Sequence, residues 1–147
     1  MRRLLAIVLI LCLALPAVPA RPASQELVLV VPADSPVREL DSVSVRKLFL
    51  GRPVLVNGSQ LHPLRNRSDA LLDEIFFQHI VAMSDSNYDR QILIGVNRQL
   101  ALRPVELNRT AEVIAALRAD PNAVSFMWQR DVGHNPQLRI IRVLWSD

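Results

Sequence analysis

Residues 26–51 read ELVLVVPADSPVRELDSVSVRKLFLG, and they predict a buried strand followed closely by a short helix. After Glu26, the stretch up to Val31 is continuously apolar and rich in β-branched residues, which is typical of a strand buried on both faces. Pro32 and Pro36 mark a turn after it. A helix is then predicted over 41–50, with Asp41 as its N-cap. Its apolar face consists of Val45, Leu48 and Phe49, and Gly51 can end it in the left-handed conformation.

Strand and helix patterns continue to alternate beyond this stretch. Helices are predicted over 68–82, 84–100 and 110–118, and strands over 61–64, 105–107, 123–127 and 138–144, with an extended piece and tight turn over 53–58. Pro63 favours an edge position for the strand at 61–64. This alternation predicts an α/β fold, a single lobe with a mixed, mainly parallel sheet flanked by helices, in which 27–31 is an interior strand.

The first twenty residues have the pattern of an export signal. Arg2 and Arg3 precede an apolar run from Leu4 to Leu15, and Val18-Pro19-Ala20 supplies small residues for cleavage after Ala20. The run is shorter than the roughly 20 residues that span a bilayer. A retained signal anchor is the alternative. We expect a signal peptide at 1–20, a secreted domain at 21–147 in the periplasm, and no membrane span after cleavage.

Composition excludes several classes of protein. Cleavage would remove Arg2 and Arg3 from the 17 basic residues and leave 15 against 14 acidic residues. Such a balance does not favour nucleic-acid binding, which calls for a clustered basic face. The single cysteine, Cys12, lies in the leader, so disulfides and thiol chemistry are not expected in the secreted part. The remaining length suits one compact core.

The order of motifs resembles the phosphate-type substrate-binding proteins of ABC transporters. The matching features are the strand at 27–31 followed by Ser35-Pro36-Val37, the helix end Leu48-Phe49-Leu50-Gly51, Leu64-Arg65 leading into Ser68 and a helix with Phe76, and the Ala-Asp-Pro-Asn-Ala-Val stretch at 119–124. The resemblance implies the type 2 periplasmic-binding fold. It covers roughly residues 27 to 144 and is similar to the short, single-lobe members of that group.

Two departures from the family pattern concern the binding site. Ser68-Asp69-Ala70 stands where the transporter proteins have Ser-Gly-Thr, and the strand at 124–127 lacks their usual glycine. A carboxylate at the start of a helix repels an anion. The resemblance therefore implies weaker phosphate binding than in the transporter proteins.

A candidate oxyanion site lies at the start of the helix predicted from Ser68. Arg65 and Arg67 offer guanidinium forks, Ser68 offers a hydroxyl, and helix N-termini attract anions. Ser35 would join them if its strand ends at the same crevice. The alternative interpretation is that Ser68 caps the helix while both arginines are solvated, and that Ser35 belongs to a turn.

No pattern of catalytic, metal-binding or cofactor-binding residues is present. His62, His79 and His134 are scattered without ligand spacing, and the sequence contains no P-loop, dinucleotide or hydrolase fingerprint. We expect neither an enzyme nor a cofactor.

Two functional classes remain, because nothing in the sequence favours an enzyme. The first is a periplasmic solute-binding protein for phosphate or another small oxyanion, which would supply an envelope transporter or a sensor. The second is a periplasmic adaptor that binds no solute and uses the same lobe to contact a protein. The arginine-rich helix start favours the first class, and the single lobe favours the second.

Overall fold

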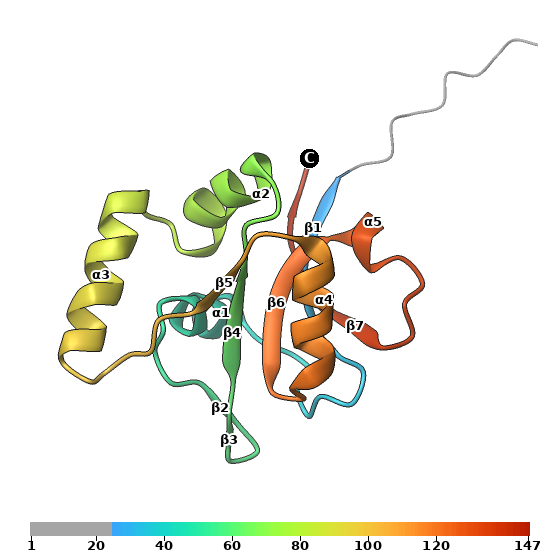
Figure 1. Cartoon of the computed structure of the whole chain (residues 1–147), viewed down its shortest axis with the longest axis horizontal. Helices are drawn as coiled ribbons and strands as arrows, with labels where there is room; N and C mark the ends of the chain where they lie inside the picture. Colours follow the sequence, from blue (N-terminus) through green and yellow to red (C-terminus); the bar gives the residue numbers. More distant parts are fainter. Residues whose placement is uncertain (1–24) are drawn as a thin grey trace, which may run out of the picture.

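The computed structural model describes residues 25–147, so the expected leader and its cleavage site lie outside the described residues. Within that part, one sheet has the order β5-β4-β6-β1-β7. The strands are β1 (Glu26–Pro32), β4 (His62–Asn66), β5 (Val105–Leu107), β6 (Ala123–Trp128) and β7 (Leu138–Ser146). β4 is parallel to β5 and β6, whereas β1 is antiparallel to β6 and β7. β1 therefore runs against the other strands (Figure 1), and the predicted mixed, mainly parallel sheet is confirmed.

β1 is the interior strand that its sequence predicts. Every residue from Leu27 to Val31 is buried. Leu27, Leu29 and Val31 face one apolar cluster, and Val28 and Val30 face another. An uninterrupted apolar run is needed here because neither face of the strand contacts water.

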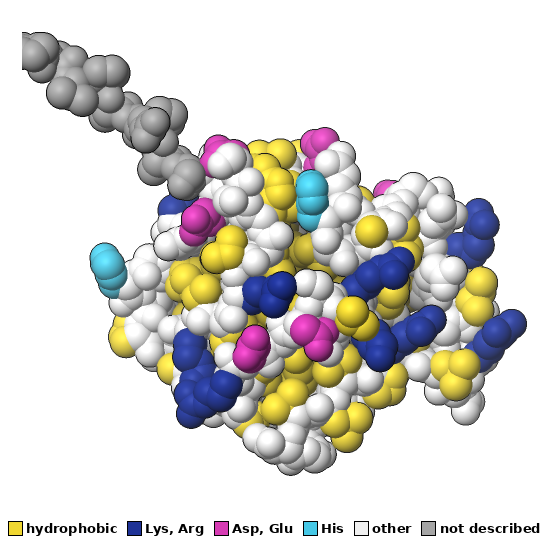
Figure 2. Space-filling view, turned by 180° about the vertical axis from the view of Figure 1, so that it is seen from behind, with side chains coloured by type: hydrophobic (Ala, Val, Ile, Leu, Met, Phe, Trp, Pro, Cys, Tyr) yellow, Lys and Arg dark blue, Asp and Glu magenta, His cyan; other side chains and the backbone are white. Residues whose placement is uncertain are grey.

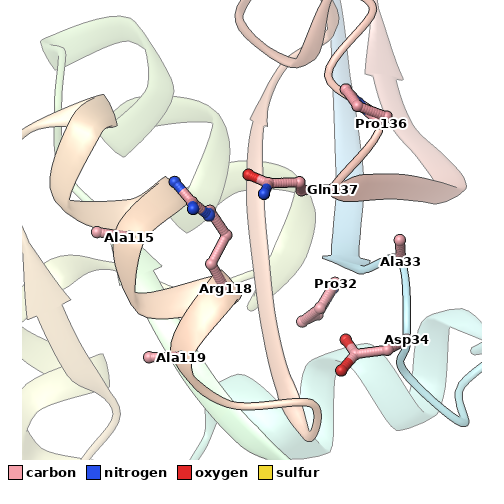
Figure 3. A pocket seen from close by; sticks show the side chains of 8 residues that line it. All are labelled: Pro32, Ala33, Asp34, Ala115, Arg118, Ala119, Pro136 and Gln137. Carbon is pink, nitrogen blue, oxygen red and sulfur yellow. The ribbon is translucent and has the colours of Figure 1, made fainter.

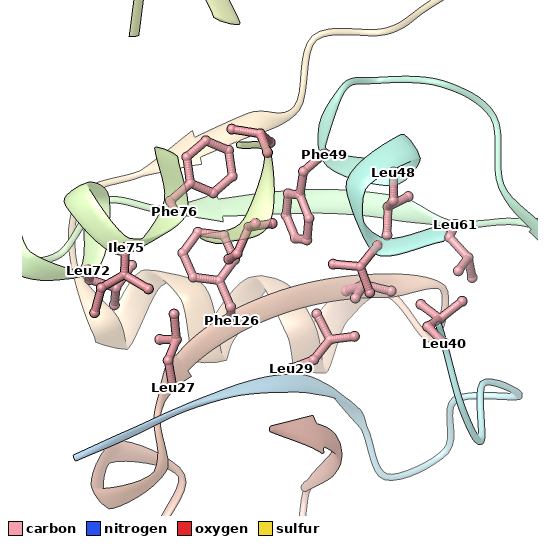
Figure 4. Close-up of a cluster of buried hydrophobic side chains, with 14 of the residues drawn as sticks. Leu27, Leu29, Leu40, Leu48, Phe49, Leu61, Leu72, Ile75, Phe76 and Phe126 are labelled. Atoms are coloured by element: carbon pink, nitrogen blue, oxygen red, sulfur yellow. The ribbon is translucent and has the colours of Figure 1, made fainter. Parts of the chain in front are cut away.

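Helices cover both faces of the sheet. One face carries α1 (Ser42–Phe49), α2 (Ala70–Ile75), the π-helical turn η1 (Phe76–Ile80) and α3 (Asp85–Asn97), and the other carries α4 (Thr110–Ala119) and α5 (Gln129–Val132). Aromatic rings form the centre of the first layer (Figure 4). Phe76 stacks on Phe126 with centroids 5.3 Å apart, and Phe49 meets Phe126 edge-on at 5.2 Å.

The prediction that 61–64 forms an edge strand is wrong. β4 lies between β5 and β6 in the sheet. Pro63 is accommodated because it sits next to the first residue of the strand, and pairing with β5 begins only at Leu64. A proline at the start of an interior strand removes no hydrogen bond from that ladder.

Helix ends agree with the sequence except at α2. Asp41 caps α1 by accepting from the Ser44 N–H at 2.7 Å, and Ser84 caps α3. Gly51 follows α1 with φ of 74°, as its position predicts. The second helix, however, begins at Ala70 with Asp69 as its N-cap, and Ser68 is not the cap. Its last part, up to Ile80, is π-helical.

Two further features complete the described part. The extended piece near 53–58 forms a hairpin of β2 (Leu55–Val56) and β3 (Ser59–Gln60), with Asn57 and Gly58 both at positive φ in the turn. α5 was not expected from the sequence.

No helix among residues 25–147 has the length and apolar character needed to cross a membrane.

Candidate functional site

The topology gathers charged side chains where β4 and β5 end. Arg65 on β4 and Glu106 on β5 are direct partners in the parallel ladder. Asp73 comes from α2, which follows β4 after a short connection. Carboxyl ends of parallel strands meet at one edge of a sheet, which is where α/β proteins commonly place their ligand sites.

Arg65 and Arg67 form a closed ring of ion pairs with Asp73 and Glu106. The Arg65 guanidinium donates from Nη2 to Asp73 Oδ1 at 2.8 Å and from Nη1 to Glu106 Oε1 at 3.0 Å. Arg67 donates to the second oxygen of each carboxylate, at 3.4 Å for Asp73 and 3.1 Å for Glu106. Both carboxylates therefore bridge both arginines, and the cluster has no net charge.

The Arg65 side chain is deeply enclosed. It is 2% exposed, and its guanidinium carbon lies 4.6 Å from the Phe76 ring centroid, 4.8 Å from that of Phe77 and 5.0 Å from that of Tyr88. Tyr88 is itself fixed by donating to the Phe49 carbonyl at 2.8 Å, and burial raises the pKa of Tyr88 to about 12. Cation–π contacts and one charge-assisted hydrogen bond to each of two carboxylates hold the guanidinium in one place.

Arg67 lies at the rim of the same cluster. Its side chain is 40% exposed. Partial burial acts to lower the pKa of Arg67, but the negative charges and hydrogen bonds of Asp73 and Glu106 outweigh it and raise that pKa. Arg67 is thus a paired cation with one side open to solvent.

The N-terminus of α2 is satisfied by the protein itself. Asp69 Oδ1 accepts from the Leu72 N–H at 2.8 Å, and its Oδ2 accepts from the Trp128 indole at 2.6 Å. The Ser68 N–H donates to Asn66 Oδ1 at 3.0 Å. The carboxylate of Asp69 therefore occupies the place that the sequence interpretation gave to a bound oxyanion.

Ser35 lies at the opposite end of the sheet from Arg65, Arg67 and Ser68. β1 is antiparallel to β6, so the end of β1 lies beside the starts of β4 and β6. Ser35 is 2% exposed, its Oγ accepts from the Val37 N–H at 3.2 Å, and its carbonyl accepts from Arg139 at 2.9 Å. The turn interpretation describes this residue, and the structure does not bring it to the proposed crevice.

The carboxylates of the cluster were missed at the sequence level. In the sequence, Asp73 is one residue of the helix predicted over 68–82, and Glu106 is the polar residue of the strand predicted over 105–107. The signal available in the sequence was an acidic residue in each of these two predicted elements. This signal becomes informative only when the order of the strands in the sheet is known.

A separate cavity of about 560 Å³ lies near Ser35, at the end of β1 (Figure 3). Small apolar residues from β1, α4 and the loop before β7 line most of it. In this view the polar ends of Arg118 from α4 and of Gln137 from the loop before β7 lie close together, and Asp34 from the turn after β1 lies on the other side of the cavity. The acidic group is therefore apart from the basic one.

Metal-binding groups are not assembled in the described part of the chain. No cluster of three or more His, Cys, Asp or Glu side chains suited to a metal ion occurs among residues 25–147. His62 instead pairs with Asp120, with Nδ1 and Oδ2 at 2.6 Å.

No family model and no curated protein matches the sequence. Solved structures do match its fold. The PstS protein of Borrelia burgdorferi aligns with a TM-score of 0.57 at 9% identity, over 80% of this chain and 47% of that one. An ABC-type phosphate transport receptor of Vibrio cholerae aligns with a TM-score of 0.52 at 16% identity, over 81% and 46%.

A third structure, from Clostridium perfringens, is described as a phosphate ABC transporter substrate-binding protein with bound phosphate. It aligns with a TM-score of 0.60 at 10% identity, over 81% of this chain and 45% of that one. The chain thus spans less than half the length of the proteins it matches. At these identities the likeness shows the fold alone, which is that of somewhat less than half of each of these substrate-binding proteins.

Proposed function

We propose that this protein is an interaction module of the cell envelope, an adaptor or sensor component that uses a substrate-binding lobe to contact another protein. The internal pairing of Arg65 is the observation that carries this proposal. Both terminal nitrogens of this buried guanidinium bind carboxylates of the same chain. Export to the periplasm is part of the proposal and is supported by the leader pattern at 1–20.

The internal carboxylates compete directly with any dissolved oxyanion. Removing one partner from a buried ion pair typically destabilises a protein by about 3–5 kcal/mol, because a buried charge loses its compensation. A phosphate ion would have to displace two tethered carboxylates from Arg65 and also offset the entropy of association. Asp69 adds a third negative charge beside the α2 N-terminus. We therefore expect free phosphate to bind weakly or not at all.

Oxyanion binding is the second candidate function, and the exposure of Arg67 favours it. Its longer contact, 3.4 Å to Asp73, is weaker than the pairs made by Arg65, and its side chain is 40% exposed. A phosphate or sulfate ion at this rim could share Arg67 with the two carboxylates. The protein would then be a solute-binding protein that serves a transporter or a sensor.

Calorimetric titration of the wild-type protein with phosphate and with sulfate, at low and at physiological salt, separates the two candidates. The interaction proposal expects no saturable heat from the wild type. Asp73→Asn combined with Glu106→Gln should remove the competing negative charges and create phosphate binding at the exposed Arg67, with circular dichroism to confirm that this variant is folded. Glu112→Gln, an exposed carboxylate on α4, is the matched control. Saturable phosphate binding by the wild type, lost in Arg67→Ala, would favour the solute-binding function instead.

A further inference from the structure

We infer that the groove between α1 and α3 docks an acidic, amphipathic segment of a partner protein. This inference rests on the proposed interaction role and deepens it by naming the surface and the chemistry of the partner. The observations that locate this groove are separate from the ion-pair cluster at Arg65.

The groove exists because α3 stands apart from the sheet (Figure 1). Tyr88 and Ile92 are the buried residues of this helix and anchor it to the core. The chain after α3 folds back, and the Leu102 N–H donates to the Gly51 carbonyl at 2.9 Å. Two adjoining hollows of about 410 and 310 Å³ lie between α3 and the end of α1, and they share Leu50, Arg52 and Gln91.

Close packing fixes one wall of the groove. Gly95 lies in the last turn of α3, and glycine inside a helix is less stable than alanine by roughly 0.5–1 kcal/mol. A side chain at this position would place its Cβ 2.7 Å from the Cβ of Ala101. Gly95 therefore allows the chain after α3 to pack closely against this helix. This packing forms one wall of the groove.

The charges along the groove have one sign. Arg46, Lys47, Arg52 and Arg98 line the two hollows, and no carboxylate does. No salt bridge within residues 25–147 involves any of these four side chains. Arg46 is partly engaged, since its Nε donates to the Val81 carbonyl at 2.9 Å. In Figure 2, Lys and Arg side chains alternate with apolar ones on the side of α3.

Apolar side chains lie between these cations. Leu50, Pro53, Ile94 and Leu100 line the larger hollow. Ile94 is 41% exposed and Leu100 is 65% exposed, so the groove presents apolar surface to solvent. An amphipathic segment recognises such a groove by inserting apolar side chains, and carboxylates on its flanks would meet the basic residues.

Two other occupants fit the geometry less well. A small oxyanion requires donors that converge on one point, whereas these cations are spread over two hollows and come from α1, α3 and the loop after α1. A lipid surface is approached best by protruding apolar side chains on a convex face. Here the basic residues line recessed hollows between two elements.

The test uses a labelled synthetic helix of about 14 residues, four turns long, with leucine on one face and glutamate on the other. A second peptide carries lysine in place of glutamate. Fluorescence anisotropy with the purified protein should show binding of the glutamate peptide only. Arg52→Glu combined with Arg98→Glu should weaken binding by at least about tenfold. Arg118→Glu combined with Arg130→Glu, the same charge change across the sheet, should leave it within about twofold.

Failure of the glutamate peptide to bind, or equal loss in both double variants, would overturn the inference. Tighter binding to phosphatidylglycerol vesicles than to the glutamate peptide, weakened by Arg52→Glu combined with Arg98→Glu, would also overturn the inference. That result would indicate that the groove binds a membrane surface. Self-association abolished by Arg52→Glu and Arg98→Glu would assign the groove to a second copy. Circular dichroism confirms that each variant is folded. The phosphate titration is a separate readout, so a phosphate-binding wild type would overturn the interaction role without changing the peptide result.

Discussion

At the scale of single residues, Arg65 links charge to packing. Its guanidinium binds two carboxylates and contacts three aromatic rings, while its side chain is almost fully buried. Lysine could not reproduce this arrangement, because an ammonium group has no planar fork. The residue therefore holds β4, β5 and α2 together at the edge where the strands end.

Replacing Arg65 with alanine should destabilise the fold strongly. Asp73 and Glu106 would lose their buried partner, and the expected decrease in the free energy of unfolding is about 3–5 kcal/mol. Urea denaturation followed by tryptophan fluorescence measures it. Arg109→Ala, which removes a pair whose arginine side chain is 79% exposed, is the control and should stay within about 0.5 kcal/mol. Similar small effects for both variants would show that the cluster does not stabilise the fold.

Asp120 should make stability depend on pH in the acid range. Partial burial acts to raise the pKa of Asp120, but hydrogen bonds from His62 and from the Asn122 N–H lower it overall. A carboxyl whose folded pKa is lowered stabilises the protein above its unfolded pKa, near about 3.9, and this contribution disappears as the pH falls through the folded value.

Asp120→Asn should therefore be less stable than the wild type at neutral pH, by less than about 1 kcal/mol because the pair is solvent-exposed. The difference should vanish in strong acid. Thermal unfolding at a series of pH values measures it, with Asp34→Asn as the control at an exposed position. A difference that grows toward low pH would contradict the assignment.

The arginines were predicted as site residues, but their partners were not. Asp73 lies eight residues after Arg65 in the chain, and Glu106 lies forty-one residues after it. Only the parallel pairing of β4 with β5 and the return of α2 over the strand ends bring these groups together. Ion pairing between distant elements leaves no periodic pattern in a sequence, and for this reason the sequence showed the cations without their partners.

At the scale of the elements, Phe76 connects the helical layer to the sheet. Its ring contacts those of Phe49, Phe77, Tyr88 and Phe126, and it is fully buried. Phe76→Ala should lower the free energy of unfolding by about 3–5 kcal/mol, through lost transfer energy and a cavity. Val43→Ala on the exposed side of α1 should change it by less than about 0.5 kcal/mol. Chemical denaturation measures both, and an effect of Phe76→Ala within the surface range would place the helix elsewhere.

Gly51 and Gly58 allow two effects of glycine to be compared, which are its tolerance of positive φ and the close approach of a neighbouring segment. Both have positive φ, 74° and 80°. A Cβ at Gly58 would meet nothing within 4 Å, whereas one at Gly51 would lie 2.1 Å from the Leu102 carbonyl oxygen. Gly58→Ala should therefore lower the unfolding free energy by about 1–2 kcal/mol. Gly51→Ala should lower the unfolding free energy by at least about 1 kcal/mol more, because its Cβ would clash with Leu102. Chemical denaturation curves measure both variants. Equal effects would mean that the segment at Leu102 can move away.

Strand content could be predicted from the sequence, but strand direction could not. The apolar run at 27–31 correctly indicates burial on both faces, because burial depends on side-chain character alone. The same run contains no information about whether β1 is parallel to its neighbours. Ser35 was placed at the wrong end of the sheet for that reason, and Pro63 was assigned to an edge because its place within the strand could not be seen.

At the scale of the whole molecule, the leader pattern predicts where the secreted protein begins. Mass spectrometry of the periplasmic fraction of an expressing bacterium should find an N-terminus at Arg21, within a few residues. An intact Met1 in the membrane fraction would contradict this and favour a retained anchor. The predicted start lies shortly before Gln25, whose N–H donates to Asp147 Oδ1 at 2.8 Å, so the two ends of the described domain are neighbours.

The position of β1 has a consequence for the order in which the chain can fold. β1 is synthesised before every other strand, yet its hydrogen-bonding partners are β6 and β7, with pairs as distant as Glu26 and Ser146. Such long-range pairing slows folding, because a large loop must close before the contacts form. The nascent domain therefore cannot complete its sheet until its C-terminal strand has emerged. Until β6 and β7 emerge, the apolar run of β1 remains without its ladder partners.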